Sequence, residues 1–412
     1  MASSEITLEA VPSVSDIKAA DWNACANPAG DPNGLENLDT LAARNGSCAV
    51  SKPTYNPFVS HGFFTAAEAS GSACARTGWG ARHLLARLNG EIVGIVPCYL
   101  KTHSQGEYVF DRGWADAYER AGGRYYPKLQ VSVPFTPATG PRLLIREGVN
   151  REQIGSALAR GLMALCNATN ASSVHVTFAR EAEAKFLGQH GFLLRNDQQF
   201  HWHNEAYGSF EDFLNSLNSR HRKAIRRERR EAVAAGVTIH RLTGADITED
   251  AWDAFFAFYM ETGSRKWGRP YLTRKFFSLI GESMSRDVLL VMAKRNGRWV
   301  AGAINFIGSD TLFGRNWGAV EHHPFLHFEV CYYQAIDFAI ERGLKVVEAG
   351  AQGEHKLARG YLPQTTYSAH FIADPDLRRA IADYLKRERA YVAEVGRELT
   401  EAGPFRKAAD EA

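Results

Sequence analysis

Apolar positions along the chain follow two periods, and the changes between them predict strands interleaved with helices. Two hairpins are the clearest signals, because Asn-Gly joins apolar runs at 88–91 and again at 295–298. Each hairpin is followed by a third strand, a Trp/Gly element, a helix and a further strand. The repeated order predicts two similar halves, and the mixture of elements predicts an α/β (α+β) fold with mixed sheets flanked by helices.

The remaining periodic segments complete this prediction. In the first half we expect a strand and a helix start at 5–20, strands at 82–87, 92–96, 108–110, 129–133 and 173–178, and helices at 56–69, 114–122, 152–168 and 181–189. In the second half we expect strands at 288–292, 299–306, 311–314 and 346–348, and helices at 209–217, 219–235, 249–262, 273–283, 328–342 and 377–398.

The domain boundary is expected near 195–208, which divides the chain into residues 1–200 and 201–412. Residues 26–53 are rich in Asn, Gly, Pro and Ser, so we expect them to form a long surface insertion in the first domain.

Composition narrows the class of protein. A chain of 412 residues is long enough for two or three domains, and 45% hydrophobic with 23% charged residues is typical of globular proteins. The net charge of +2 gives no overall attraction to nucleic acid or membrane, so a charged partner must meet a local patch. Six cysteines without a Cys-x-x-Cys pair argue against a disulfide framework and a zinc knuckle. The lack of a signal peptide and of a long apolar stretch predicts a cytoplasmic chain without membrane insertion.

A basic stretch is the strongest local charge feature. Seven of the eleven residues from 220 to 230 are Arg or Lys, and Glu228 is the one acid among them. At helical spacing, Arg222, Arg226 and Arg229 share one flank. The arginine fork suits phosphate oxygens, so the functional interpretation is binding of a phosphate-bearing substrate or tRNA. The alternative interpretation is a solvated basic face.

The second candidate is the loop that follows the predicted strand at 346–348. It holds three glycines between 348 and 360, which allow a backbone to approach a ligand closely, and it places His355 beside Lys356. Acyl transfer to an amine needs a base for the amine and a positive donor for the developing oxyanion, and these two residues could supply both. The alternative is a turn with incidental charge.

Histidines gather at 322–329, where His327 and Glu329 lie at a predicted helix start. Pro324 breaks the helix that would align them, and the spacing matches no zinc-binding pattern, so we expect no metal. We expect both residues to face a cleft instead.

Aromatic side chains with polar tips form a further band in the first half. Such side chains often line small-molecule clefts, although core or interdomain packing is an equal alternative. The candidates in this band are Asp111, Trp114, Tyr118, Tyr126 and Lys128.

Together these motifs resemble the Fem-like predicted N-acyltransferases of the wider GNAT superfamily, often labelled peptidoglycan biosynthesis/recognition proteins. The resemblance spans roughly residues 56 to 388. It is carried by Asn56-Pro-Phe-Val-Ser-His61, Gly106-Glu-Tyr-Val-Phe-Asp111, Trp114-Ala-Asp-Ala-Tyr118, Tyr125-Tyr-Pro-Lys128, Pro134-Phe-Thr-Pro137, Gly140-Pro-Arg142, Gln199-Phe-His-Trp202, the basic stretch, Leu326-His-Phe-Glu329 and Gly350-Ala-Gln-Gly-Glu-His-Lys356.

The resemblance implies two tandem GNAT-like domains around a central cleft and transfer of an acyl or aminoacyl group to an amine acceptor, such as a peptidoglycan precursor. The donor would be a co-substrate (aminoacyl-tRNA, acyl-CoA or acyl carrier protein), with no tightly bound cofactor. By motif position, Lys356 would stabilise the oxyanion, and His355 or Glu329 would be the base. The substrate-binding candidates are Asp111, Trp114, Tyr118, Tyr126, Lys128, Arg222, Arg226, Arg315, Trp317, His327 and Gln352.

Two departures from the resemblance keep alternatives open. The usual GNAT pyrophosphate loop is absent, and Arg315-Asn-Trp-Gly-Ala stands in its place. There is also no long heptad segment for a coiled-coil arm. The alternatives are an acyl-CoA-dependent small-molecule N-acyltransferase, a non-catalytic binding protein on the same fold, and an RNA-binding protein that would depend on the basic stretch alone.

Overall fold

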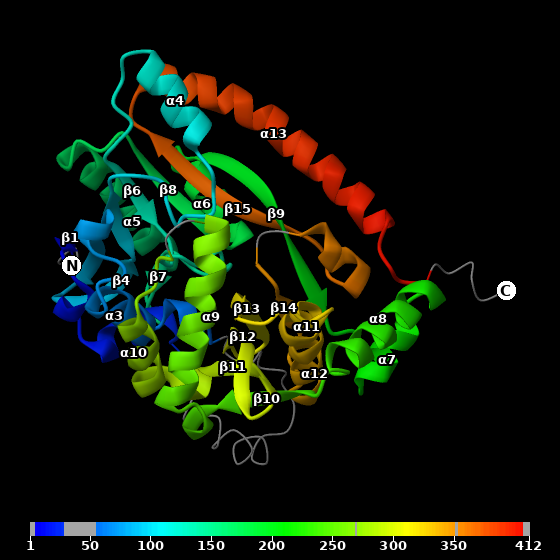
Figure 1. The fold of residues 1–412 in the computed structure, drawn as a ribbon. Helices are drawn as coiled ribbons and strands as arrows, with labels where there is room; N and C mark the ends of the chain where they lie inside the picture. Colours follow the sequence, from blue (N-terminus) through cyan, green and yellow to red (C-terminus); the bar gives the residue numbers. More distant parts are fainter. Residues whose placement is uncertain (1–4, 29–54, 268–269, 351–352, 407–412) are drawn as a thin grey trace, which may run out of the picture.

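The computed structural model describes residues 5–28, 55–267, 270–350 and 353–406. Its strands and helices are interleaved in an α/β fold (Figure 1), which confirms the predicted fold class. The elements of the first half are β1 (Ile6–Val11), α1 (Ala19–Ala26), α3 (His61–Ala69), β2 (Trp79–Ala81), β3 (His83–Leu88), β4 (Glu91–Val96), β5 (Cys98–Lys101), α4 (Arg112–Arg120), β6 (Lys128–Val131), β7 (Leu144–Ile145), α5 (Arg151–Ala168), β8 (Ser173–Ala179), α6 (Glu181–Gln189) and β9 (Leu193–His203).

The second half begins with two helices that precede its first strand. Its elements are α7 (Phe210–Ser216), α8 (Ser219–Ala232), β10 (Val237–Thr243), α9 (Glu249–Trp267), α10 (Arg274–Met284), β11 (Val288–Arg295), β12 (Arg298–Ile307), β13 (Thr311–Ala319), α11 (Leu326–Phe328), a π-helical turn (Glu329–Tyr333), α12 (Gln334–Glu341), β14 (Val346–Glu348), a 3₁₀ helix (Glu354–Arg359), β15 (Leu362–Ile372) and α13 (Pro375–Glu401).

Within the described residues, the strands form a four-stranded sheet in the order β1-β3-β4-β7 and an eleven-stranded sheet in the order β10-β11-β12-β13-β14-β9-β15-β8-β6-β5-β2. The two halves share a hairpin that is later followed by a strand, a helix and a parallel strand. The first half also contains β5, α4 and β7, and its hairpin lies in the four-stranded sheet. The hairpin β3–β4 is followed by β6, by helix α5, and by β8, which runs parallel to β6. The hairpin β11–β12 is followed by β13, by helix α12, and by β14, which runs parallel to β13.

Strand β9 connects the two halves within one sheet. It pairs with β14 on one side and with β15 on the other, and β15 pairs in turn with β8. The last strand of the chain therefore lies between two strands of the first half, as the ribbon of Figure 1 shows. Residue 200, where the two predicted domains meet, lies inside β9. The division into domains 1–200 and 201–412 stays a prediction.

The strand predicted at 108–110 is wrong. These residues form a loop in which Tyr108 has a left-handed φ of 61°, and the strand that follows the first hairpin is β5. The apolar pattern also predicts neither β9 nor β15. Both strands turn polar side chains inward, for example Gln199 and His370 at 1% and 0% exposure, so neither shows the apolar alternation of an ordinary half-buried strand.

The predicted basic helix at 219–235 ends at Ala232. The predicted insertion at 26–53 falls outside the described residues from 29 onward, so it stays a prediction.

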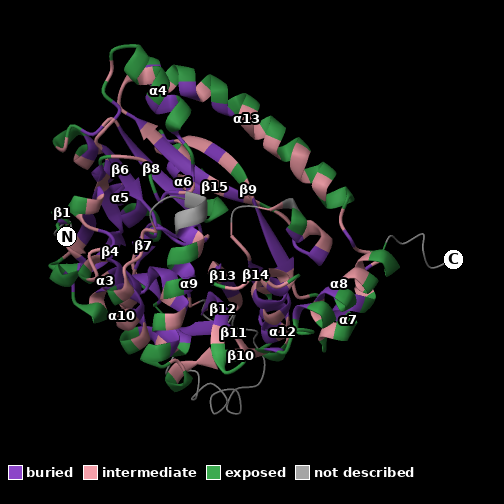
Figure 2. Ribbon diagram, in the orientation of Figure 1, coloured by how far each residue is buried: buried purple, intermediate pink, exposed green. Residues whose placement is uncertain are grey.

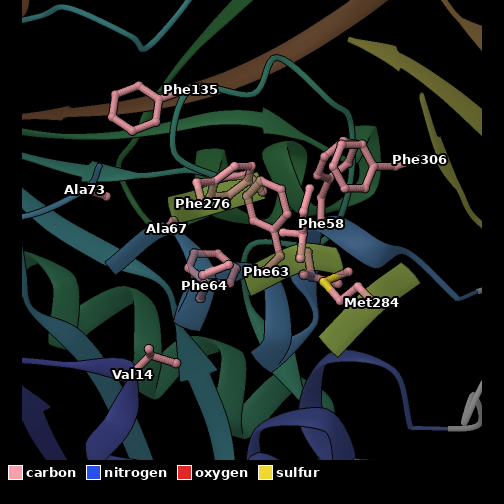
Figure 3. Packing of buried hydrophobic residues seen from close by; sticks show 14 of the residues in the cluster. Val14, Phe58, Phe63, Phe64, Ala67, Ala73, Phe135, Phe276, Met284 and Phe306 are labelled. Carbon is pink, nitrogen blue, oxygen red and sulfur yellow. The ribbon is translucent and has the colours of Figure 1, made fainter. Parts of the chain in front are cut away.

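Apolar packing also joins the two halves. Phe58 and Phe63 of the first half meet Phe276 and Phe306 of the second, with ring centroids 4.8 Å apart for Phe58–Phe306 and 5.6 Å for Phe63–Phe276. Figure 3 shows these rings gathered in one cluster. The interface is therefore part of the core and not a loose contact between domains.

Burial follows the sheets. Strands of the large sheet are buried, whereas helices α8 and α13 turn an exposed face to solvent (Figure 2). Across the ranges that the structure describes, no helix combines the length and the apolar character needed to cross a membrane.

Candidate functional site

Charged and polar side chains meet where the two halves share the large sheet. Strand β14 ends at Glu348, which is paired with His201 of β9. Directly paired residues of neighbouring strands share a face of the sheet, so these two side chains lie together. In the loop after β14, Lys356 lies close enough to His201 for its charge to lower the pKa of that imidazole. We call Arg315, Glu348, His201 and Lys356 the seam site.

Arg315 reaches the seam site through an irregularity in β13. Between Ala303 and Asn305 the pairing with β12 shifts, because β13 carries three steps from Gly314 to Trp317 against two in its partner. This β-bulge contains Arg315, and bulges commonly redirect side chains beside functional sites. The charge of Arg315 acts on both Glu348 and Lys356.

A loop of the first half covers the seam site. Arg315 Nη2 donates to the carbonyl of Phe135 at 3.0 Å, and Gln199 Nε2 donates to the carbonyl of Pro137 at 2.7 Å. The backbone N–H of Thr139 donates to Glu348. The motif Pro134-Phe-Thr-Pro137 therefore contributes backbone groups that cover the seam site from the other half.

Lys356 is held in place by the loop that precedes it. Its ammonium donates to the carbonyl oxygens of Ala349 at 2.6 Å and Gly350 at 3.0 Å, and the side chain is 3% exposed. The turn requires Gly353, whose φ of 118° is open to glycine but strained for other residues. Burial, with a smaller effect of Arg315, lowers the pKa of Lys356 to about 8 against the opposing effect of Cys331. The ammonium is thus fixed and buried, and no carboxylate among the described residues pairs with it.

Glu348 is the second buried titratable group of the seam site, at 7% exposure. Burial raises its pKa to about 8, against the opposing effects of the Thr139 N–H, Arg315 and Arg142, and with a small contribution from Asp310. No local sequence pattern identifies Glu348 as a site residue, because its spatial neighbours come from distant parts of the chain.

A pocket opens beside Arg315 at the junction of the halves. Its cavity volume is about 10 Å³, which is room for about one water molecule. Arg315, Asn316 and Thr136 are its polar members, and phenylalanines such as Phe135 and Phe306 form most of the wall (Figure 3). The junction thus combines an apolar wall with a cation, but the cavity is much smaller than a small-molecule site.

The structure brings three further predicted residues together. The His327 ring lies between Trp317 at 5.2 Å and His355 at 6.1 Å, measured between centroids. His355 is exposed, and its Nε2 is 2.9 Å from the hydroxyl of Tyr332. Because Trp317 follows Arg315 in the same strand, this aromatic group borders the seam site.

Glu329 is committed to a different set of contacts. It lies in the π-helical turn, is 3% exposed, and receives Arg229 Nη2 at 3.0 Å and Arg229 Nε at 3.1 Å. Gln334 Nε2 adds a donor at 2.7 Å, and Arg229 also reaches Asp337 at 2.7 Å. These bonds occupy the acceptor positions that a free base would need.

Helix α8 keeps most of its basic side chains on the surface. Arg226 pairs with Glu211, and Arg222 Nη1 is 3.4 Å from the Leu217 carbonyl. The remaining cations form its exposed face, which Figure 2 shows in green: Arg220, Lys223, Arg227 and Arg230.

The place of Glu228 among the cations of the sequence suggests that it neutralises this face, but in the structure it does not. It turns inward, accepts Arg359 Nη2 at 2.9 Å on both oxygens, and accepts the hydroxyl of Tyr333. The outer face of α8 is consequently more positive than the sequence indicates.

A second polar centre lies in the first half. Lys128 donates to Glu107 at 2.6 Å and to Asp111, and Lys101 lies 3.8 Å from Glu107. All four side chains are at most 4% exposed. We call Lys101, Glu107, Asp111 and Lys128 the N-terminal charge cluster. Asp111 and Lys128 are predicted from the sequence. Lys101 and Glu107 are not, because no local sequence pattern marks them.

Imidazoles extend the N-terminal charge cluster toward β15. Tyr125 donates to Asp111 at 2.7 Å, and the Nδ1 atoms of His175 and His370 are 2.7 Å apart. Burial lowers the pKa of His175 to about 3, with Lys128 adding to the effect.

The other predicted aromatic residues surround the same centre. Trp114 stacks on His175 with centroids 6.1 Å apart, and Tyr126 bonds to Ser104 at 2.8 Å. Tyr118 lies on α4, where burial and Asp374 raise its pKa. The predicted site residues thus fall into two separate groups, and Gln352 lies outside the described residues.

No group of three or more His, Cys, Asp or Glu side chains in the described ranges could hold a metal ion. The absence of a metal stays a prediction.

Comparison with known proteins yields one family match. Residues 13–407 match the model of the FemAB_like family, described as peptidoglycan biosynthesis/recognition. No curated protein matches the chain.

Solved structures with a similar fold include FemX, a tandem GNAT protein and L-PGS. FemX is 12% identical, with 76% of this chain and 93% of FemX covered and a TM-score of 0.48. A tandem GNAT protein from the clavulanic acid biosynthesis pathway is 13% identical, with 90% and 99% covered and a TM-score of 0.46. L-PGS from Bacillus licheniformis is 9% identical, with 81% and 98% covered and a TM-score of 0.48. Similarities this low assign no activity to the chain.

Proposed function

Because this chain belongs to the FemAB-like peptidoglycan biosynthesis/recognition family, we propose that it is a transferase that moves an acyl or aminoacyl group from an activated carrier to an amine. The carrier is aminoacyl-tRNA, acyl-CoA or acyl carrier protein, and the first acceptor to test is the amine of a peptidoglycan precursor. These are cytoplasmic molecules, so the proposal includes a cytoplasmic location.

The observation that carries the proposal is the state of Lys356. Its ammonium is buried and fixed by two carbonyl oxygens, and no carboxylate in the described ranges neutralises it. When an amine attacks a carbonyl carbon, negative charge develops on the oxygen. A preorganised ammonium in a dry site stabilises that charge more than it stabilises the neutral ground state, and Arg315 adds a second positive charge nearby.

The carrier phosphates would bind to the exposed face of α8. Arg220, Lys223 and Arg230 point outward there, and the inward turn of Glu228 leaves their charge uncompensated. Arginine and lysine on one face suit a polyphosphate or an RNA backbone. Arg222 and Arg226 remain the proposed phosphate contacts on the flank of the same helix.

Two residues are predicted as the proton acceptor. Glu329 is engaged by Arg229 and Gln334, whereas His355 is exposed beside Tyr332. Of these two, His355 has the better access to an incoming amine.

A donor panel tests the proposed function. Purified protein would be incubated with bulk aminoacyl-tRNA, short and long acyl-CoAs, or acyl carrier protein, each with a nucleotide-linked peptidoglycan precursor or a simple amine. Mass spectrometry would detect the new amide. Loss of product after RNase treatment identifies tRNA as the carrier, and product from acyl-CoA with a simple amine supports the small-molecule alternative. Binding without an amide from any pair would contradict the transferase and favour a non-catalytic binding protein.

A further inference from the structure

We infer that Glu348, and not His355 or Glu329, accepts the proton of the attacking amine at the seam site. The inference deepens the proposed transferase function and rests on it. Glu348 is the last residue of β14, and its carboxylate lacks a side-chain hydrogen-bond donor among the described residues.

The position of Glu348 links it directly to the proposed oxyanion site. Lys356 donates at 2.6 Å to the carbonyl of Ala349, the residue that immediately follows Glu348. The ammonium is therefore anchored at the backbone of the residue next to Glu348, just beyond the end of β14. Arg315, in the bulge of the neighbouring strand, acts electrostatically on both.

The carboxylate of Glu348 has no side-chain partner that would fix its protonation state. Throughout the ranges that the structure describes, no side chain donates a hydrogen bond to it, and its donor is the backbone N–H of Thr139. The nearby Arg142 is used elsewhere, because its Nε bonds to the Thr177 carbonyl at 2.9 Å and its Nη2 to the Ala138 carbonyl at 2.6 Å. Glu329 differs in this respect, since Arg229 holds both of its oxygens.

The surroundings of Glu348 place its titration near neutral pH. The groups around it are Arg315 on β13, His201 on β9, Arg142 and Thr139 in the covering loop, Asp310 before β13, and Lys356 in the following loop. Burial raises the pKa of Glu348 to about 8, because the other groups do not compensate for its removal from water. A base is most effective when its pKa lies near the working pH, since it is then both available and strong enough.

The step balances without any further reactant. The amine nitrogen attacks the carbonyl carbon, a C–N bond forms, and negative charge moves to the oxygen facing Lys356. The proton leaves the nitrogen for Glu348. The C–O or C–S bond to the carrier then breaks with its electron pair, and the protonated Glu348 returns the proton to the leaving oxygen or sulfur. The carboxylate is regenerated, and the products are an amide and the free carrier.

The activity test uses Glu348→Gln, which keeps the shape of the side chain and removes its basicity. The donor would be the carrier that is active in the panel, and the acceptor would be methoxyamine, which is unprotonated throughout the pH range. We expect kcat to fall by about 10²–10⁴-fold. In the wild type, kcat should rise toward about pH 8 as Glu348 loses its proton and fall above it as Lys356 loses its own. We expect the rise on the acid side to disappear in the variant. Formate, an added carboxylate, should partly restore the activity of Glu348→Ala. No such rescue is expected if Glu348 has only a structural role.

The matched control is Glu183→Gln. Glu183 is a half-buried glutamate that accepts backbone N–H groups, from Arg142 at 2.9 Å and Leu143 at 2.6 Å, and burial raises its pKa. Its loss should change stability and leave the pH profile of kcat unchanged. A Glu348→Gln enzyme with the wild-type rate and pH profile would overturn the inference while leaving the transferase function intact.

A readout without turnover separates the two proposals. Protein labelled with ¹³C at glutamate carboxyls should show, by NMR, one resonance that titrates near pH 8 and that is absent from Glu348→Gln. If the variant fails to fold, the wild-type spectrum still decides, because the lack of any glutamate carboxyl titrating above pH 7 contradicts the inference. A transferase that is inactive with every donor, but shows this titration, would instead count against the proposed function.

Discussion

The N-terminal charge cluster and the seam site both bury lysine, but the charges of Lys128 and Lys356 are met in opposite ways. Burial alone would lower the pKa of Lys128, yet Glu107 and Asp111 outweigh it and raise that pKa. Lys356 donates to backbone carbonyls instead, so burial lowers its pKa to about 8. A buried ammonium between two carboxylates has its charge compensated within the protein. One that meets carbonyl oxygens, and no carboxylate in the described ranges, is left without an acid to balance its charge.

The comparison teaches which centre is suited to chemistry. In the N-terminal charge cluster, Glu107 and Asp111 compensate the charge of Lys128, whereas burial lowers the pKa of the neighbouring Lys101 to about 7. Such a network holds a loop and a helix in place. In the seam site, Lys356 and Arg315 outweigh the single carboxyl of Glu348. An excess of positive charge in a buried site stabilises a developing oxyanion. A binding role for Asp111 and Lys128 stays a prediction.

The sharpest way to break this contrast is Lys128→Met. It leaves Glu107 and Asp111 buried without their cation, so we expect the free energy of unfolding to fall by about 3–5 kcal/mol. Chemical denaturation measures it. The control Lys185→Met removes a 65% exposed lysine paired with Glu181 and should leave the free energy of unfolding nearly unchanged. A Lys128→Met protein of normal stability would show that the N-terminal charge cluster does not hold the fold.

Lys356→Met should have the opposite profile. It keeps the aliphatic stem and removes a charge that no carboxylate in the described ranges balances, so we expect turnover to fall by about 10²–10³-fold with a near-normal melting temperature. Turnover of the active donor and acceptor pair, with calorimetry on the same sample, measures both quantities. Full turnover in this variant would remove Lys356 from the mechanism and transfer its role to His355 or Arg315.

Acid should destabilise the fold through its buried imidazoles, which are His175 and His370 beside the N-terminal charge cluster and His201 in the seam site, where burial lowers the pKa to about 3. Burial lowers the folded-state pKa of His175 to about 3 and that of His370 well below its usual value, so the unfolded chain binds more protons below pH 6.5. The stability of this pair is complete above about pH 6.5. It is lost as the pH falls toward 3, by up to about 1.4 kcal/mol per pH unit for each imidazole.

Unfolding experiments between pH 7 and pH 4 would measure this slope. His370→Asn should reduce the slope of unfolding free energy against pH by the contribution of one imidazole. An unchanged slope in that variant would show that the His175–His370 pair does not titrate as described.

The smallest effect is expected on the surface of α8. Arg222→Ala with Arg226→Ala should weaken binding of the carrier and reduce the dependence of log Kd on log salt by about 1 for each phosphate that the variant no longer binds. Stability should change by less than about 1 kcal/mol, because the Arg226–Glu211 pair is roughly half exposed on both sides. Equal affinities of variant and wild type at low and at high salt would rule out this helix as the phosphate site.

Local pattern is enough for much of the fold. Helix 181–189 and strand 346–348 occur with the predicted bounds, and both hairpins occur where Asn-Gly joins two apolar runs. These elements follow from periodicity and turn chemistry, which act over a few residues. The excess of cations in α8 and the adjacency of His355 and Lys356 in one loop are likewise visible in the sequence alone.

Only the tertiary structure decided how these parts meet. Strand β15 pairs with β9 across a separation of some 160 residues, as in Leu362 with His201, and neither strand has an apolar alternation to reveal it. The same fold turns Glu228 inward, commits Glu329 to Arg229, and leaves Glu348 buried with no side-chain donor among the described residues. The physical reason is that burial and charge compensation depend on residues brought together from distant parts of the chain. A sequence shows which groups can ionise, and only their packing determines which of them stay uncompensated.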